Sequence, residues 1–161
     1  MNWQASPFLF DRSTHSPEET QRLGGSLAAI LQPGDCVCLT GTLGAGKTTF
    51  VRGLIQGILG PETTVNSPTF NIVSLYDQGP FPIWHIDLYR FENDDEWIEL
   101  GLNETQEGLL IIEWPEKAEK FIRQSALVLN FDISQNNLKI IFTGTKNWSE
   151  RLKPLQTSFE K

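Results

Sequence analysis

The sequence predicts an α/β domain in three layers, in which helices cover both faces of a mixed parallel and antiparallel sheet. Two short, uniformly apolar runs at 36–40 and 109–112 are typical of strands that are buried on both faces, as in parallel sheets. Two further strands, 72–76 and 83–89, are separated only by residues 77–82. Because parallel neighbours need a crossover of about a dozen residues, this pair is expected to form an antiparallel hairpin.

The first helix is expected from Pro17. Ser16 and Glu19 have the spacing of a capping box, and proline suits the first helical position. Apolar side chains follow at helical spacing, and Pro33-Gly34 is expected to end this helix. The other expected elements are helices at 47–59 and 115–122, a short acidic helix within 92–99, and a closing hairpin of 126–133 with 138–142. The acidic helix is interpreted as a solvated face, with a docking surface for a basic partner as the alternative.

The chain is expected to be a single domain spanning 1–161, because this length is enough for one hydrophobic core. We expect that core within about 16–143 and assign no structure to 144–161. Cys36 and Cys38 lie one residue apart in an apolar run, which indicates small core residues rather than a disulfide or a zinc site. Neither a membrane-spanning run nor a signal sequence is recognised, so we expect a cytoplasmic protein without a membrane partner.

The charge balance argues against a protein that holds nucleic acid on a basic surface. The chain has 13 Lys and Arg against 20 Asp and Glu, a formal net charge of -7. Affinity for nucleic acids rests on neutralising phosphates with basic side chains. If the chain serves a nucleic acid, we expect a partner protein to hold it.

A phosphate-binding motif lies between the first buried strand and the helix that follows. Residues 41–49 match the pattern G-x-x-x-x-G-K-[ST]. Glycines let successive N–H groups point inward, and the start of the helix adds its positive dipole end, so loop and helix form a socket for phosphate. The expected fold is therefore that of a P-loop NTPase. Its expected nucleotide-binding residues are Gly41, Leu43, Gly44, Ala45, Gly46, Lys47, Thr48 and Thr49.

A magnesium site is expected beside this loop. Lys47 should reach the β and γ phosphates, while the Thr48 hydroxyl should ligate Mg²⁺. Glu113 ends the buried run at 109–112, and ligands collect at the carboxyl ends of strands in open α/β sheets. We expect Glu113 to be the second metal ligand. The alternative is a carboxylate that complements the dipole of the helix beginning at Pro115.

Asp87 is the other expected catalytic residue, with Glu113 and Lys47. Alternation along the strand puts His85, Asp87 and Tyr89 on one face. An unpaired carboxylate among apolar neighbours is costly unless a cation, a hydroxyl or a metal-bound water meets it. For His85 alone, the favoured interpretation is a hydrogen-bonded strand residue.

Four segments in order, 41–49, 67–70, 85–90 and 112–116, resemble the motif set of the bacterial TsaE family, and the likeness extends from about Ser16 to Phe142. The resemblance implies a small P-loop ATPase that uses ATP and Mg²⁺ and serves the synthesis of threonylcarbamoyladenosine in tRNA. It implies an accessory role beside TsaD-like and TsaB-like proteins, with tRNA reached only through that complex.

The family pattern also assigns roles to individual residues. It implies that Lys47 and Thr48 serve the phosphates and Mg²⁺, that Glu113 serves the metal, and that Asp87 is needed for activity near it. The loop residues Ser67 and Thr69, which could sense a γ-phosphate or form an ordinary turn, match a switch-like loop of the family. Trp114 matches a segment associated with activity and partner contact. Thr42 stands where the family usually has an aspartate.

Two other functions stay open at this point. A kinase for a small molecule or nucleoside would also use a phosphate loop and an aspartate, although such kinases usually carry an arginine-rich lid. A nucleotide-gated binding module without significant turnover is the second alternative. GTP is disfavoured because no Asn-Lys-x-Asp run occurs. Only Arg52 and Arg90 are plausible arginines near the site, so we expect slow ATP hydrolysis alone and stimulation by partners.

Overall fold

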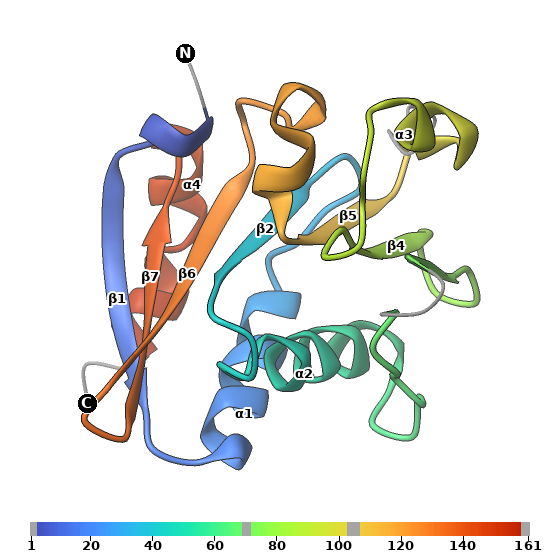
Figure 1. Ribbon diagram of the computed structural model, residues 1–161. Coiled ribbons are helices and arrows are strands. Elements are labelled where there is room, and N and C mark those ends of the chain that lie inside the picture. Colours follow the sequence, from blue (N-terminus) through green and yellow to red (C-terminus); the bar gives the residue numbers. More distant parts are fainter. Residues whose placement is uncertain (1–2, 69–71, 103–106, 159–161) are drawn as a thin grey trace.

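The computed structural model describes residues 3–68, 72–102 and 107–158, which form one seven-stranded sheet with helices around it (Figure 1). In chain order the elements are η1 (Trp3–Ala5), β1 (Phe8–Thr14), α1 (Pro17–Ala28), β2 (Cys36–Gly41), α2 (Lys47–Leu59), β3 (Val73–Tyr76), β4 (Ile83–Asp87), α3 (Asp95–Glu99), β5 (Leu109–Glu113), η3 (Pro115–Phe121), β6 (Leu127–Ser134), β7 (Asn137–Thr143), α4 (Lys146–Arg151) and α5 (Lys153–Ser158).

The sheet is mixed, as the sequence predicts. Its strand order is β1-β7-β6-β2-β5-β4-β3. The four central strands β6, β2, β5 and β4 run parallel, while β3, β7 and β1 are antiparallel to their neighbours. Both expected hairpins are confirmed, β3 with β4 and β6 with β7. The second turns through Gln135 and Asn136, both at positive φ, which suits the right-handed twist of the strands.

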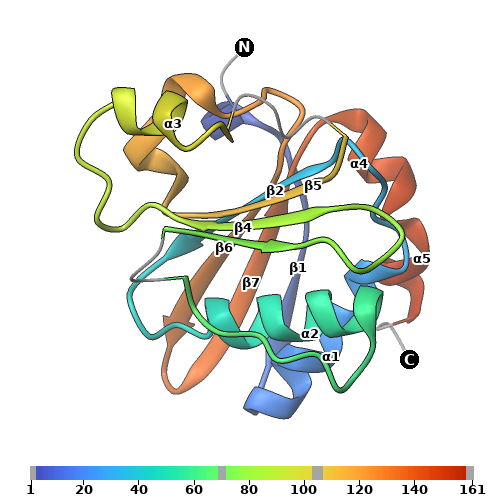
Figure 2. The ribbon, with the colours of Figure 1, turned by 90° about the vertical axis from the view of Figure 1, so that its right-hand side faces the viewer.

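Helices cover both faces of the sheet, so the predicted three layers are confirmed (Figure 2). Along β2, Val37 and Leu39 face the core beneath α1 and α2, whereas Cys36 and Cys38 face the core beneath α3 and η3. The same alternation continues in β5 and β6. Both cysteines are buried and unbridged, as expected of small core residues.

The two long helices lie in close contact against one another. A Cβ at Gly24 of α1 would lie 2.1 Å from the Phe50 carbonyl oxygen, and one at Gly53 of α2 would lie 1.9 Å from the Gln21 carbonyl oxygen. Helix α1 ends at Ala28, earlier than the Pro33-Gly34 pair predicts. The reason is local: the amides of Ile30 and Leu31 bond three residues back rather than four, which tightens the chain into a turn.

Both ends of the chain contribute to the structure beyond the range expected for the core. Strand β1 adds an edge to β7, where the rings of Phe10 and Phe142 stack with centroids 4.4 Å apart. Helices α4 and α5 bury Trp148, Leu152 and Leu155 in the core that also holds α1 and α2. The indole N–H of Trp148 donates to the carbonyl of Ser125 at 2.7 Å.

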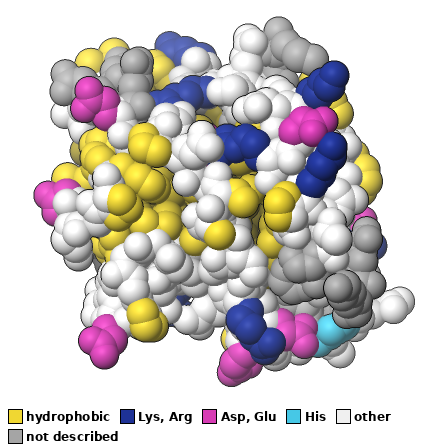
Figure 3. Space-filling view, turned by 180° about the vertical axis from the view of Figure 1, so that it is seen from behind, with side chains coloured by type: hydrophobic (Ala, Val, Ile, Leu, Met, Phe, Trp, Pro, Cys, Tyr) yellow, Lys and Arg dark blue, Asp and Glu magenta, His cyan; other side chains and the backbone are white. Residues whose placement is uncertain are grey.

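On the face opposite to the view of Figure 1, the described side chains form no continuous basic surface (Figure 3). Lys and Arg side chains are spaced apart there, and apolar side chains gather on the left of the view. This pattern agrees with the net charge of -7. In the described part of the chain, no helix is both long and apolar enough to cross a membrane.

Candidate nucleotide-binding site

The glycine-rich loop joins β2 to α2 in the expected strand, loop and helix order. Helix α2 begins at Lys47, and its N-cap residue, Gly46, has φ 103° and no side-chain cap. The first amides of the helix therefore have no capping side chain and are suited to an anion. Gly41 has φ 130°, and a Cβ there would lie 2.5 Å from the Phe131 carbonyl oxygen. Both features require glycine at this position.

Lys47 lies almost entirely within the protein, with 5% of its surface exposed. Its Nζ donates to the Gly41 carbonyl oxygen at 2.8 Å and lies 3.9 Å from the centroid of the Trp114 ring. Burial lowers the pKa of Lys47, and the nearby carboxylates of Glu113, Glu116 and Asp87 oppose that shift. The ammonium group is thus held between a carbonyl, an aromatic face and acidic side chains.

Two buried carboxylates end adjacent strands, because the parallel register of β4 and β5 pairs Asp87 with Glu113. Asp87 Oδ1 accepts the Tyr89 amide at 2.9 Å, and Glu113 Oε2 lies 2.6 Å from His85 Nε2. Burial raises the pKa of Asp87; the Tyr89 amide opposes this, and the like charge of Glu113 adds to it. A pair of carboxylates in this setting favours a bound cation.

Most of the expected site residues surround one cavity of about 260 Å³. The loop, α2 and both carboxylates contribute to its wall, together with the exposed Ser67 and with Trp114. Its lining residues are Leu43, Gly44, Gly46, Lys47, Thr48, Thr49, Ser67, Asp87, Glu113 and Trp114. Three expected residues are not among these lining residues. Gly41 accepts a hydrogen bond from Lys47, Ala45 lines a neighbouring cavity, and Thr69 lies outside the described residues.

Mg²⁺ fits this donor set. The ion is usually bound in proteins by one or two carboxylates together with substrate phosphates and water, and not by a cage made only of protein groups. Thr48 offers a hydroxyl, and Glu113 and Asp87 offer carboxylates at the same cavity. Within the described ranges, no group of three or more His, Cys, Asp or Glu side chains could hold a metal by itself.

A second cavity of about 320 Å³ borders the same loop. It shares Gly44, Gly46 and Thr49 with the first. The turn between β1 and α1 and the tip of the β6–β7 hairpin complete its wall. The lining residues that it does not share with the first cavity are Thr14, His15, Ser16, Pro17, Thr20, Ala45, Asn136 and Leu138.

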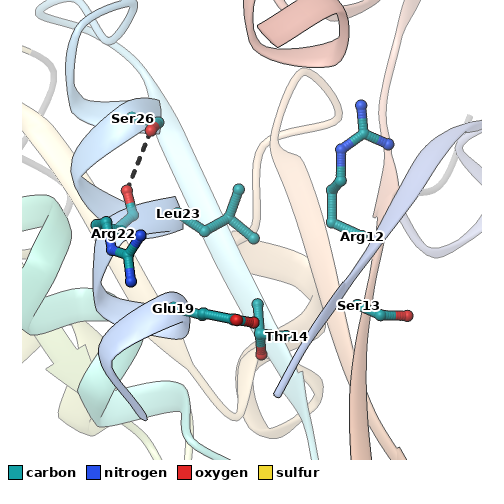
Figure 4. A pocket seen from close by; sticks show the side chains of 7 residues that line it. All are labelled: Arg12, Ser13, Thr14, Glu19, Arg22, Leu23 and Ser26. Atoms are coloured by element: carbon teal, nitrogen blue, oxygen red, sulfur yellow. Dashed lines mark hydrogen bonds between the residues drawn. The ribbon is translucent and has the colours of Figure 1, made fainter. Parts of the chain in front are cut away.

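A further pocket of about 320 Å³ lies between α1 and β1, with Leu23, Thr14 and Glu19 directed into it (Figure 4). Two of its three charged side chains already serve the fold. Arg12 donates to the carbonyls of Asp11 and Gln156, and Glu19 accepts the amide of His15. The two cavities at the loop are therefore the candidate ligand sites.

The family model for "Threonylcarbamoyl adenosine biosynthesis protein TsaE" matches residues 14–141. The chain belongs to the TsaE family. The match begins at the last residue of β1 and ends within β7, so it contains the loop and both carboxylates. Expected membership of this family is thereby confirmed.

Relatives named "tRNA threonylcarbamoyladenosine biosynthesis protein TsaE" agree with this assignment. The protein from Rickettsia conorii is 40% identical over 139 residues, which is 84% of this chain and 79% of its own length. The protein from Bacillus subtilis is 39% identical over 142 residues, which is 86% of this chain and 88% of its own length. A crystal structure of Bacillus subtilis YdiB covers 94% of this chain and 96% of that chain, with a TM-score of 0.75 and 31% identity.

Sequence reasoning missed part of this TsaE site. The contact of His85 with Glu113 depends on the register of β4 against β5, which the sequence does not give. The β1 side of the second cavity was not expected either, although the capping box at Ser16 lies beside it. The helix expected at 115–122 is a 3₁₀ helix, Pro115–Phe121, with a kink at Ala118, where φ is -139° and ψ is 46°.

Proposed function

We propose that this TsaE protein binds ATP with Mg²⁺, hydrolyses it, and acts as an accessory protein in tRNA threonylcarbamoyladenosine modification beside TsaD-like and TsaB-like proteins. The main support is the cavity that joins the phosphate loop with Lys47, Thr48, Asp87 and Glu113. The pathway follows from the names of the relatives. A cytoplasmic location is part of the proposal, because the proposed pathway modifies tRNA.

The phosphates of ATP would bind against the loop. The uncapped amides at the start of α2 donate to phosphate oxygens, and Lys47 adds a charge-assisted contact. The Gly41 carbonyl accepts one of the three Nζ–H groups, so the other two can donate to phosphate oxygens. Thr48 and Glu113 would hold Mg²⁺, which would supply charge neutralisation on the phosphate oxygens.

Asp87 is proposed to orient the attacking water. Its Oδ1 is fixed by the Tyr89 amide, so Oδ2 remains to accept a hydrogen bond from water. Burial keeps competing solvent away from this carboxyl, and the Lys47 ammonium partly balances its charge. Ser67 borders the same cavity and is placed to contact the γ-phosphate side.

The second cavity is proposed to hold the ribose and base. It shares loop residues with the first, so one ATP molecule can extend from one cavity into the other around the loop. His15 and Asn136 offer polar groups, while Pro17 and Leu138 offer apolar contact. This mixture of apolar wall and few polar groups is typical of small-molecule sites.

Slow hydrolysis by the isolated chain is part of the proposal. No arginine is among the described residues that line either cavity at the loop. An arginine supplied to a P-loop site raises turnover by about 10³ to 10⁵. A partner that supplies such a group would therefore accelerate hydrolysis.

The proposal is tested with labelled ATP, Mg²⁺ and a panel of nucleosides, using the full chain alone and then with purified TsaD-like and TsaB-like proteins. We expect free phosphate as the product, released slowly by the chain alone and faster in the mixture. Phosphorylated nucleoside would indicate a kinase instead. Rapid turnover without partners would contradict the accessory role, and a lack of nucleotide binding would contradict the whole proposal.

A further inference from the structure

His85 is completely buried beside the proposed metal ligand. It lies on β4, two residues before Asp87, and its side chain has no exposed surface. Its Nε2 lies 2.6 Å from Glu113 Oε2 on the neighbouring strand, a short distance typical of a strong hydrogen bond to a charged acceptor. The parallel register places His85 opposite Ile111. This pair lies two residues before the pair of Asp87 and Glu113 along the two strands.

An imidazole at this buried position lowers the stability of the fold. Its second nitrogen, Nδ1, has no hydrogen-bond partner among the residues that the structure describes. Burial of an unpaired polar atom destabilises a fold, and apolar side chains such as Ile83 and Ile86 fill the neighbouring buried positions of β4. An apolar residue at 85 would pack without that penalty, so packing does not explain the histidine.

The contact with Glu113 does explain it. A carboxylate at the end of a glutamate side chain rotates over a broad range unless a partner holds it. Among the hydrogen bonds of the described residues, Glu113 is held by His85 through Oε2 alone, which leaves Oε1 for a ligand at the cavity that Glu113 lines.

We infer that His85 is a positioning residue for the metal site, because its Nε2–H group holds one oxygen of Glu113 and so orients the other toward Mg²⁺. This inference rests on the proposed function and deepens it. Hydrogen-bond partners of metal ligands change metal affinity by about 10- to 100-fold when they are removed. His85 would therefore act on metal affinity and not on the binding of nucleotide itself.

Two variants separate positioning from packing. His85→Met fills the site without a donor, whereas His85→Gln keeps an N–H group near the place of Nε2. For each full-length protein, Mn²⁺ binding to the complex with a non-hydrolysable ATP analogue is measured by electron paramagnetic resonance. Analogue binding in EDTA and thermal unfolding are measured on the same samples. Should His85→Met fail to fold, His85→Asn takes its place, because its amide is too short to reach Glu113.

We expect the donor-free variant to lose about 10- to 100-fold in Mn²⁺ affinity and His85→Gln to recover most of that loss. Analogue binding in EDTA should stay unchanged, and both variants should keep a cooperative thermal transition. Unchanged Mn²⁺ affinity in the donor-free variant, or an equal loss in both variants, would overturn the inference. A parent chain that binds no analogue would overturn the proposed function and this inference together, which distinguishes the two failures.

Discussion

At the scale of single residues, Lys47 gives the most direct test of the phosphate site. Lys47→Ala removes a charge-assisted contact worth about 1.5–3 kcal/mol, so ATP affinity should fall by about 10- to 150-fold. Isothermal titration with ATP measures the loss. Lys153→Ala is the matched control, since this lysine is exposed and pairs with Glu150 at the surface. Equal affinities for the parent and Lys47→Ala would rule out the phosphate socket.

Asp87 should reveal a conflict between stability and function. Burial raises its pKa above the ordinary 3.8. The stability that this group contributes is therefore complete below pH 3.8 and is lost as the pH rises through the raised pKa. Above that pH the buried charge destabilises the protein without nucleotide. Asp87→Asn should accordingly be more stable than the parent at pH 7, with a gain that disappears toward pH 3.8.

Urea unfolding across that pH range measures this effect. Asp77→Asn, which changes an exposed carboxylate, serves as the control and should show no comparable gain. The same Asp87→Asn protein should bind ATP and fail to hydrolyse it. A variant that is less stable than the parent at pH 7 would show that the desolvation of Asp87 is not the dominant influence.

At the scale of elements, the turn between β1 and α1 is expected to contact the nucleoside. His15→Ala should weaken ATP binding by about 2- to 10-fold, as for one lost hydrogen bond, and leave tripolyphosphate binding unchanged. Ser13→Ala is the control, because Ser13 lines the pocket of Figure 4 and not the second cavity. A parallel loss for ATP and tripolyphosphate would instead indicate a disturbed phosphate loop.

The contact between α1 and α2 allows a paired test of packing. Gly53→Ala would place a Cβ 1.9 Å from the Gln21 carbonyl oxygen, so it should destabilise the protein by about 1–3 kcal/mol. Gly25→Ala would meet only an ordinary contact of 3.5 Å with the Gly53 carbonyl oxygen, and should gain up to about 1 kcal/mol from helix propensity. Chemical denaturation compares the two. A change in the free energy of unfolding with the same sign in both variants would contradict the close contact inferred at Gly53.

At the scale of the whole molecule, the last two helices are expected to be required for folding. Deletion of 144–161 removes Trp148, Leu152 and Leu155 from the core, and Arg151 from its contacts with Asp35. Truncating one large buried side chain costs about 2–5 kcal/mol, while a domain is stable by only about 5–15 kcal/mol. The shortened chain should therefore lose its cooperative thermal transition, whereas Trp148→Ala alone should only lower its midpoint. A cooperative transition at the parent temperature would refute this.

The sequence by itself determined the fold class, the phosphate loop with its flanking strand and helix, both hairpins and the TsaE family. The family follows from the resemblance of four ordered motifs, and the other features follow from local signals: uniformly apolar strands, glycines at fixed spacing, and turns too short for a parallel crossover. It also named Lys47, Asp87 and Glu113, whose residue types suit phosphate and metal chemistry.

Only the tertiary structure decided how those residues meet. The strand order and the register of β4 against β5 bring Asp87 beside Glu113 and His85 into contact with it. The pairing of β1 with β7 brings His15 to the loop from outside the motifs. Such contacts join residues far apart in the chain, so no local pattern encodes their geometry. That geometry is set by the strand register, which is fixed when both faces of the sheet are buried at once.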